Sequence, residues 1–197
     1  IWKNNEYIED ERISLPSGSI IYGFNLADLE KDGEEEIILI DNNDYLKVFS
    51  DKGELLWKSD DIYGGTMNFI IKYPEGSEPN QYTEDLETRL YMQNRVLIYN
   101  HSGENRIVVI KNIPSAGKLF ERIRVYGKSE VYRFVWDGLG LSENWKTQKI
   151  HGYIADFQIK DMDNDEVDEL VVGIVKISLK SIFGSAKSYV LAYDFND

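Results

Sequence analysis

Short apolar or alternating segments, each ended by turn-forming residues, follow one another along the chain. Between residues 20 and 58 they occupy 20–24, 36–40, 45–49 and 54–57. Alternation with a period of two, rich in β-branched and aromatic residues, is typical of strands, and no segment keeps a helical period. Four short strands joined by short turns form an up-and-down meander, as in one blade of a β-propeller. The pattern therefore predicts an all-β chain.

The strand pattern continues through the rest of the sequence. Further predicted strands occupy 12–15, 67–71, 88–92, 95–99, 106–110, 153–159, 170–175 and 188–193. The polar, proline-bearing stretch 73–80 interrupts the pattern, and we expect a surface insertion there. The last group has three predicted strands, so we expect the final unit to lack a fourth, for which residues 12–15 are one candidate. An open sheet edge of this kind invites pairing with another chain.

Two loops with the same spacing of acidic residues each precede an apolar strand. The N-terminal acidic loop spans residues 28–36 and the C-terminal acidic loop spans 161–169, with acids at positions one, three, five and nine of each. Calcium takes six to eight oxygen ligands, and carboxylates at alternate positions of a tight loop can all turn inward around the ion. The sequence therefore predicts two Ca²⁺ sites. The expected ligands are Asp28, Glu30, Asp32, the Glu34 carbonyl and Glu36 in one loop, and Asp161, Asp163, Asp165, the Val167 carbonyl and Glu169 in the other.

Two other structures carry acidic loops of similar composition. An EF-hand requires an acidic residue at its twelfth position, where Leu39 and Val172 stand, and the segments that follow are strand-like; an EF-hand is therefore excluded. Acidic surface turns without metal are the second alternative, because Asp, Asn and Gly are common turn residues. The recurrence of one spacing favours metal. Gly33 permits a sharp turn in one loop, and its counterpart Glu166 must turn by other means.

Aligning Gly103 with Gly33 reveals a third copy of the loop that has lost its acids. An apolar or cationic side chain at a ligand position does not coordinate calcium, so we expect this copy to be a loop that binds no metal. Its positions one, three, five and nine are Ile98, Asn100, Ser102 and Arg106.

A second landmark recurs independently of the acidic loops. The segment Trp57-Lys-Ser is repeated as Trp145-Lys-Thr, each time with Ile and Gly at the same later positions. Together the landmarks divide the chain into repeat units at about 12–62, 63–150 and 151–197, a length that suits four-stranded blades with insertions. Residues 1–197 are expected to form a single partial β-propeller of about three four-stranded antiparallel blades.

The acidic loops are also where the chain resembles a known family, the FG-GAP or VCBS repeat of integrin-α-like β-propellers. That repeat carries Asp-x-Asp-x-Asp-Gly-x-x-Asp/Glu before a short apolar strand, and both loops match it, with Glu30 and Glu166 as departures. The segments 63–65, 136–138 and 152–156 also look like exported bacterial VCBS-repeat proteins, so the resemblance covers about 12–195. It implies calcium that rigidifies each loop, blades of a larger propeller, and an extracytoplasmic location at the cell surface, in the periplasm or outside the cell.

Composition narrows the partner classes. Against 22 Lys and Arg stand 35 Asp and Glu, and the net charge of −13 argues against nucleic acid and anionic membranes as partners. There is no cysteine, hence no disulfide or thiolate site, and no apolar window is long enough for a membrane span. Since the sequence begins at Ile1 without a signal peptide, we expect a processed or truncated chain.

Catalytic patterns are weak in this sequence. His101 and His151 have no neighbours that suggest a catalytic triad, and there is no glycine-rich phosphate loop. We therefore expect a calcium-binding, non-enzymatic propeller region that mediates protein–protein contact or cell-surface assembly, with a protein partner, an oligomer or the remainder of the propeller completing it. A carbohydrate-binding region, or an ancillary region of an extracellular hydrolase or lyase, is the alternative.

Overall fold

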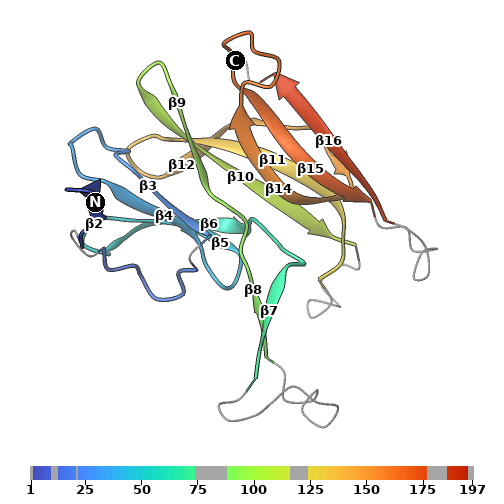
Figure 1. Ribbon diagram of the computed structural model, residues 1–197, viewed down its shortest axis with the longest axis horizontal. Coiled ribbons are helices and arrows are strands. Elements are labelled where there is room, and N and C mark those ends of the chain that lie inside the picture. Colours follow the sequence, from blue (N-terminus) through green and yellow to red (C-terminus); the bar gives the residue numbers. More distant parts are fainter. Residues whose placement is uncertain are drawn as a thin grey trace.

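The structure, a computed structural model, describes residues 2–9, 13–20, 22–73, 88–115, 124–176 and 186–194. These ranges contain strands and no helix, which confirms the all-β prediction (Figure 1). Residues 13–15 are not in a strand, so the strand predicted at 12–15 is wrong there; Pro16 ends that short segment and lacks a donor for sheet pairing. Residue 12 and residues 74–80 of the expected insertion lie outside the described ranges.

The first sheet is an antiparallel meander of four strands. Its order is β3 (Phe24–Ala27), β4 (Glu36–Ile40), β5 (Tyr45–Phe49) and β6 (Leu55–Ile62). The first strand begins later than the apolar run at 20–24 suggests, because the N–H of Gly23 donates to the carbonyl of Ile20 at 2.8 Å in a tight turn. The N-terminal acidic loop joins β3 to β4.

The second and third sheets repeat this meander. The second contains β9 (Leu97–His101), β10 (Glu104–Pro114), β11 (Tyr126–Trp136) and β12 (Leu141–Lys146), with β13 (Ile150–His151) also paired to β11. The third contains β14 (Tyr153–Lys160), β15 (Glu169–Lys176) and β16 (Lys187–Asp194). Within the described residues the third sheet has three strands, as the sequence predicts.

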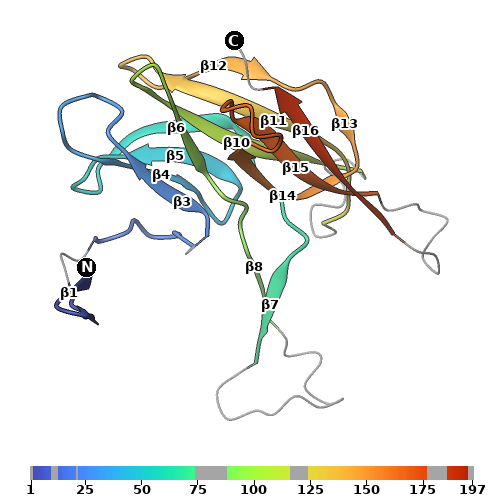
Figure 2. The same ribbon diagram turned by 45° about the horizontal axis from the view of Figure 1, so that its top comes forward.

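Two hairpins stand apart from these sheets. One pairs β1 (Trp2–Lys3) with β2 (Glu6–Tyr7), and the other pairs β7 (Phe69–Lys72) with β8 (Thr88–Tyr91). The β7–β8 hairpin projects away from the three sheets in both views (Figures 1 and 2).

The second sheet is buried on both faces, and each face has its own core. Ile107 and Val109 of β10 pack with side chains of the first sheet such as Ile38. The alternate residues of β10, Val108 and Ile110, pack with Ile154, Leu170 and Val172 of the third sheet. Successive side chains of a strand point to opposite faces, so one strand supplies both cores. The three sheets are therefore stacked face to face with the second in the middle.

A buried polar cluster ties the second sheet to the third. The Asn112 Nδ2 atom donates to the carbonyls of Gly65 and Ile154 at 2.7 and 3.0 Å. In return, the Ile154 N–H and the Ser129 Oγ donate to Asn112 Oδ1 at 3.0 and 2.5 Å. A buried amide whose hydrogen-bonding groups are all engaged fixes the relative position of the elements it joins.

Three connections lie at one end of the stack, at the top of Figure 1. They are the N-terminal acidic loop, the β9–β10 hairpin and the C-terminal acidic loop, and each joins the first strand of a sheet to the second. At this end the Asn105 Nδ2 atom of β10 donates to the main-chain carbonyl of Asp28 at 2.8 Å. The two acidic loops thus flank the tip of the hairpin, whose two turn residues, Ser102 and Gly103, are uncharged.

Candidate metal centre

The C-terminal acidic loop gathers four carboxylates. One oxygen from each of Asp161, Asp163, Asp165 and Glu169 lies within 4.8 Å of the others. Oxygens that share one calcium ion at its usual distance are at most about 5 Å apart, so the group has the dimensions of a calcium shell. The three aspartates and the glutamate expected from the sequence are therefore brought together here.

Hydrogen bonds within this loop curl the backbone around its first acid. Asp161 accepts the N–H groups of Asn164 and Glu166 at 2.6 and 3.1 Å. The Val167 N–H donates to Asp165 Oδ1 at 2.8 Å, so the main chain at position seven is held beside the cluster. Such short side-chain-to-backbone bonds are typical of Asp and Asn in turns. The loop is shaped by its own carboxylates.

The N-terminal acidic loop shares two of these bonds, from positions six to one and seven to five, and its other bond to position one comes from position five instead of four. Asp28 accepts the N–H groups of Asp32 and Gly33 at 3.2 and 3.0 Å, and the Glu34 N–H donates to Asp32 Oδ1 at 3.0 Å. The backbone is left-handed at positions four and six of both loops. The four residues are Lys31 (φ 60°), Gly33 (φ 94°), Asn164 (φ 65°) and Glu166 (φ 71°).

The last acid of each loop is buried and closes it. Glu36 accepts the N–H of Leu29 at 2.7 Å, and Glu169 accepts that of Met162 at 2.7 Å. Both side chains are less than a tenth exposed. Burial raises the pKa of Glu36, while the N–H groups of Leu29 and Glu30 act in the opposite direction. A buried carboxylate at the first residue of a strand is costly unless hydrogen-bonded or paired with a cation.

The two loops differ in how far their acids converge. Among the described residues only the C-terminal loop brings its four carboxylates within 4.8 Å; Asp28, Glu30, Asp32 and Glu36 are not grouped in this way. Glu30 and Asp32 are exposed at the loop surface, as is Glu34. Glutamate at position three is one methylene longer than the aspartate of the other loop. The backbone of the N-terminal loop therefore resembles that of the C-terminal loop, but its four carboxylates do not come together at one point.

At residues 98–106 the sequence predicts a third copy of the loop, but the structure has a tight hairpin there, so this prediction is wrong. Ile98 and Asn100 lie within β9 and Arg106 lies within β10, and they are joined by a two-residue turn, Ser102 and Gly103. Both turn residues have positive φ, 54° and 79°, which matches the twist of an antiparallel hairpin. No loop remains to enclose an ion at this position.

The structure adds a feature that the sequence interpretation missed. A groove of about 560 Å³ opens between the outer strands of the second and third sheets. Trp145, Lys149 and His151 line one side of it, and Lys176 and Tyr189 line the other. The signal in the sequence is the recurrence of Trp57 at Trp145, which above serves only to mark the repeat units.

No protein-family model, curated protein or solved structure matches this chain. Within the described ranges, no helix is long and apolar enough to cross a membrane. The chemistry available at the acidic loops is the binding of a hard cation by carboxylate and carbonyl oxygens. We therefore infer the function of the acidic loops from their geometry alone.

Proposed function

We propose that this chain is a calcium-stabilised, non-enzymatic β-propeller region of an exported protein, which mediates protein–protein contact or surface assembly. The observation that carries the proposal is the convergence of Asp161, Asp163, Asp165 and Glu169 in a loop whose backbone bonds recur at residues 28–36. Two loops with the same acid spacing and two shared side-chain-to-backbone bonds, at equivalent positions of two sheets, favour a shared ligand over chance surface turns.

The stacking of the sheets supports the propeller part of the proposal. In a propeller, antiparallel four-stranded sheets pack face to face around an axis, with their first strands innermost. Here β9 of the second sheet lies beside both β3 and β14, the first strands of its neighbours. The sheets fall in the three expected repeat units, apart from His151 at the end of β13. Three such sheets form part of a ring, and a partner or further blades would complete it.

The exposure of the ligands supports an extracytoplasmic setting. Asp163 and Asp165 are exposed, so an ion held by this loop would also be in contact with solvent. Open sites of this kind bind calcium weakly and fill only where the ion is abundant, as outside the cell. The expected role of the ion is to hold the loop and the strand that follows it.

Thermal unfolding with calcium and with a chelator tests the proposal. Calcium binding to the folded chain alone should raise the melting temperature, because a ligand stabilises the state to which it binds. Replacing Asp163 with Ala should remove most of the calcium-dependent rise, and Asp32→Ala should show whether the second site fills. Titration calorimetry should give the number of sites.

Asn100→Ala is the matched control, since Asn100 occupies position three of the hairpin that replaces the third loop. Its calcium response should equal that of the unaltered chain. Melting curves that are the same in calcium and in chelator, for a chain shown to be folded, would refute the calcium part of the proposal.

A further inference from the structure

The two acidic loops differ in how they are attached to the rest of the fold. Leu29, at position two of the N-terminal loop, is 6% exposed and belongs to the core shared by the first and second sheets. Met162, at the same position of the C-terminal loop, is 50% exposed. Burial of an apolar side chain stabilises the backbone that carries it. At position two, therefore, the N-terminal loop is anchored in a core and the C-terminal loop is not.

A hydrogen bond from the second sheet gives the N-terminal loop another anchor. The Asn105 Nδ2 atom of β10 donates to the main-chain carbonyl of Asp28, at position one of this loop. The described hydrogen bonds of residues 161–168 instead begin and end within the C-terminal loop. Within the described part of the chain, the C-terminal loop is thus not bonded to a neighbouring sheet.

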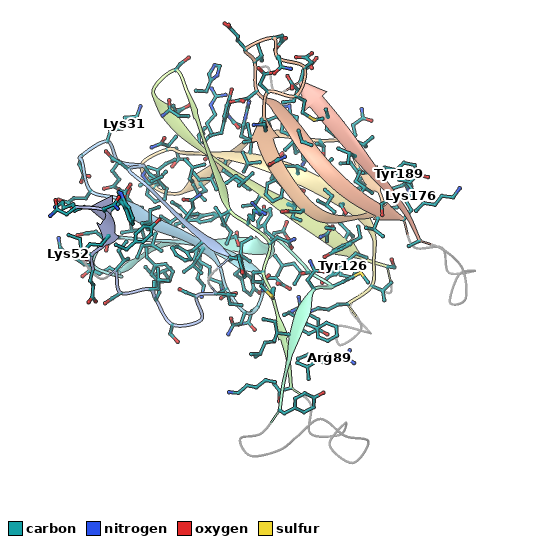
Figure 3. All side chains as sticks on the ribbon, in the orientation of Figure 1. Lys31, Lys52, Arg89, Tyr126, Lys176 and Tyr189 are labelled. Carbon is teal, nitrogen blue, oxygen red and sulfur yellow. The ribbon has the colours of Figure 1, made fainter. Side chains whose placement is uncertain are left out.

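The charges of the C-terminal loop also oppose its observed shape. Each loop contains six acids, but the N-terminal loop also contains Lys31 (Figure 3), whereas residues 161–169 include no basic residue. Four carboxylates of the C-terminal loop lie within 4.8 Å of one another. Like charges at this distance repel, so the loop needs a cation to keep its acids together. The acids of the N-terminal loop are not gathered in this way and repel one another less.

The C-terminal loop leads directly into the core between the second and third sheets. Glu169 begins β15, and the next residue, Leu170, is fully buried and paired with Ile159 of β14. Loss of the loop's shape would therefore open β14 and β15 from this end. The other end of β14 is held separately, because Asn112 of the second sheet bonds both the N–H and the carbonyl of Ile154.

We propose that calcium at the C-terminal loop is a local switch, which keeps the loop end of β14 and β15 packed on the second sheet, whereas the first sheet keeps its packing without the ion. The inference rests on the calcium part of the proposed function and adds which part of the fold responds to the ion. A fall in calcium would loosen one end of the stack of sheets and leave the other end intact.

Amide hydrogen exchange of the full chain, read by mass spectrometry with calcium and with a chelator, tests the inference. Calcium at about 5 mM exceeds the dissociation constants of weak extracellular sites. In chelator, residues 157–172 should exchange about tenfold faster or more, because opening at the loop end exposes their amides. Residues 24–40, and residues 150–156 at the other end of β14, should change by less than about twofold.

Neutral residues at two ligand positions should remove the need for the ion. Asp163→Asn with Asp165→Asn keeps oxygens that can accept the loop's N–H bonds and removes two of the four charges. Residues 157–172 of this variant should exchange more slowly in chelator than those of the unaltered chain, and should no longer respond to calcium. Glu30→Gln with Asp32→Asn, at the same two positions of the other loop, is the matched control and should leave the response of the third sheet unchanged.

Removing an anchor should transfer calcium dependence to the first sheet. Asn105→Ala leaves the Asp28 carbonyl without its bond from the second sheet. Residues 24–40 of this variant should exchange about twofold faster or more in chelator, since their loop is less firmly held. Residues 157–172 should behave as in the unaltered chain.

Equal acceleration of both regions in chelator, or acceleration of residues 24–40 alone in the unaltered chain, would overturn the inference. Titration calorimetry in parallel keeps the two proposals distinct. Calcium binding without a change in the exchange of residues 157–172 would refute this inference alone. A folded chain that binds no calcium would refute the calcium part of the proposed function and the inference with it.

Discussion

Position six of each acidic loop needs a left-handed backbone, and the two loops meet that need with different residues. Gly33 adopts φ 94° with no heavy atom near the place of an added Cβ, so a side chain there meets only backbone strain. Glu166 adopts φ 71° with a side chain. Left-handed conformations cost a non-glycine residue about 1–2 kcal/mol, so at position six the strain falls on the C-terminal loop.

Exchanging glycine at these positions should have opposite effects. Gly33→Ala should lower the free energy of unfolding by about 0.5–1 kcal/mol and Glu166→Gly should raise it by a similar amount, after the entropy of glycine in the unfolded chain is included. Urea denaturation in chelator measures both. Glu166→Gln removes the charge and keeps the strain, so a rise as large as that of Glu166→Gly would contradict the backbone explanation.

Asp41 holds the turn between β4 and β5. Its carboxylate accepts the N–H groups of Asn43 and Tyr45 at 2.8 and 3.0 Å and lies 2.7 Å from the Lys47 ammonium. Burial alone would raise the pKa of Asp41, but Lys47 and the two N–H groups outweigh burial and lower it below its ordinary value of 3.8. The ionised carboxylate therefore favours the folded state.

Asp41→Asn should destabilise the chain by about 1–3 kcal/mol at pH 7, since it weakens hydrogen bonds to a charged group. Because the folded pKa lies below the unfolded one, this contribution is present above the unfolded value and is lost as pH falls through the folded value. The difference between the two proteins in urea denaturation should thus shrink below about pH 4. Asp51→Asn, at an exposed turn, should change stability by no more than about 0.5 kcal/mol at any pH.

At the scale of the strands, the period-two pattern located the sheets well where burial alternates. The predicted strand at 45–49 matches β5, where Leu46 and Val48 are fully buried and their neighbours are not. The prediction fails at residues 22–23, which lie in a turn, and at residues 13–15, which pair with no other strand among the described residues. An apolar segment becomes a strand only when another strand lies beside it, and that depends on tertiary contacts.

The candidate site, like the strands, could be predicted from the sequence only in part. Acid spacing alone located the ligands of the C-terminal loop, because they lie close in sequence and the loop's own hydrogen bonds position them. The two-residue turn at Ser102 and Gly103 could not be read from the loss of acids, since a loop without metal and a tight hairpin fit the same residues. The groove depends on side chains from two sheets, so local spacing did not reveal it.

The contact between Gly140 and Trp57 holds the outer strands of the first two sheets together. Gly140→Ala would place a Cβ within 2.3 Å of the indole ring, and we expect a loss of about 1–3 kcal/mol through overpacking. Combining it with Trp57→Leu should recover part of that loss, because the residues are in contact. Additive losses in the double-mutant cycle, measured by urea denaturation, would show that the two do not interact.

At the scale of the whole molecule, the second sheet joins the first sheet to the third. Its two faces supply both cores, and Asn112 joins it through Gly65 and Ile154 to the neighbouring segments. The first and third sheets each share one of these two cores and the second sheet shares both, so opening of the first or third sheet should cost less than opening of the second.

Asn112→Ala should lower the free energy of unfolding by about 3 kcal/mol or more, since it leaves several buried backbone groups without partners. Ser129→Ala should cost less, because it removes one hydroxyl from the same cluster. Hydrogen exchange should show the loss chiefly in β14, which contains Ile154. Asn100→Ala, on an exposed position of β9, should leave both measurements nearly unchanged.

Both acidic loops lie at one end of the stack, so their carboxylates contribute to the electric dipole of the molecule (Figure 1). Without metal, that end concentrates carboxylates in exposed loops, and an anion exchanger should hold the protein by it. Two bound calcium ions would add four positive charges there and reduce the dipole, so elution should move to lower salt. The ion would thereby change which side of the protein approaches a charged surface, without any change in the fold.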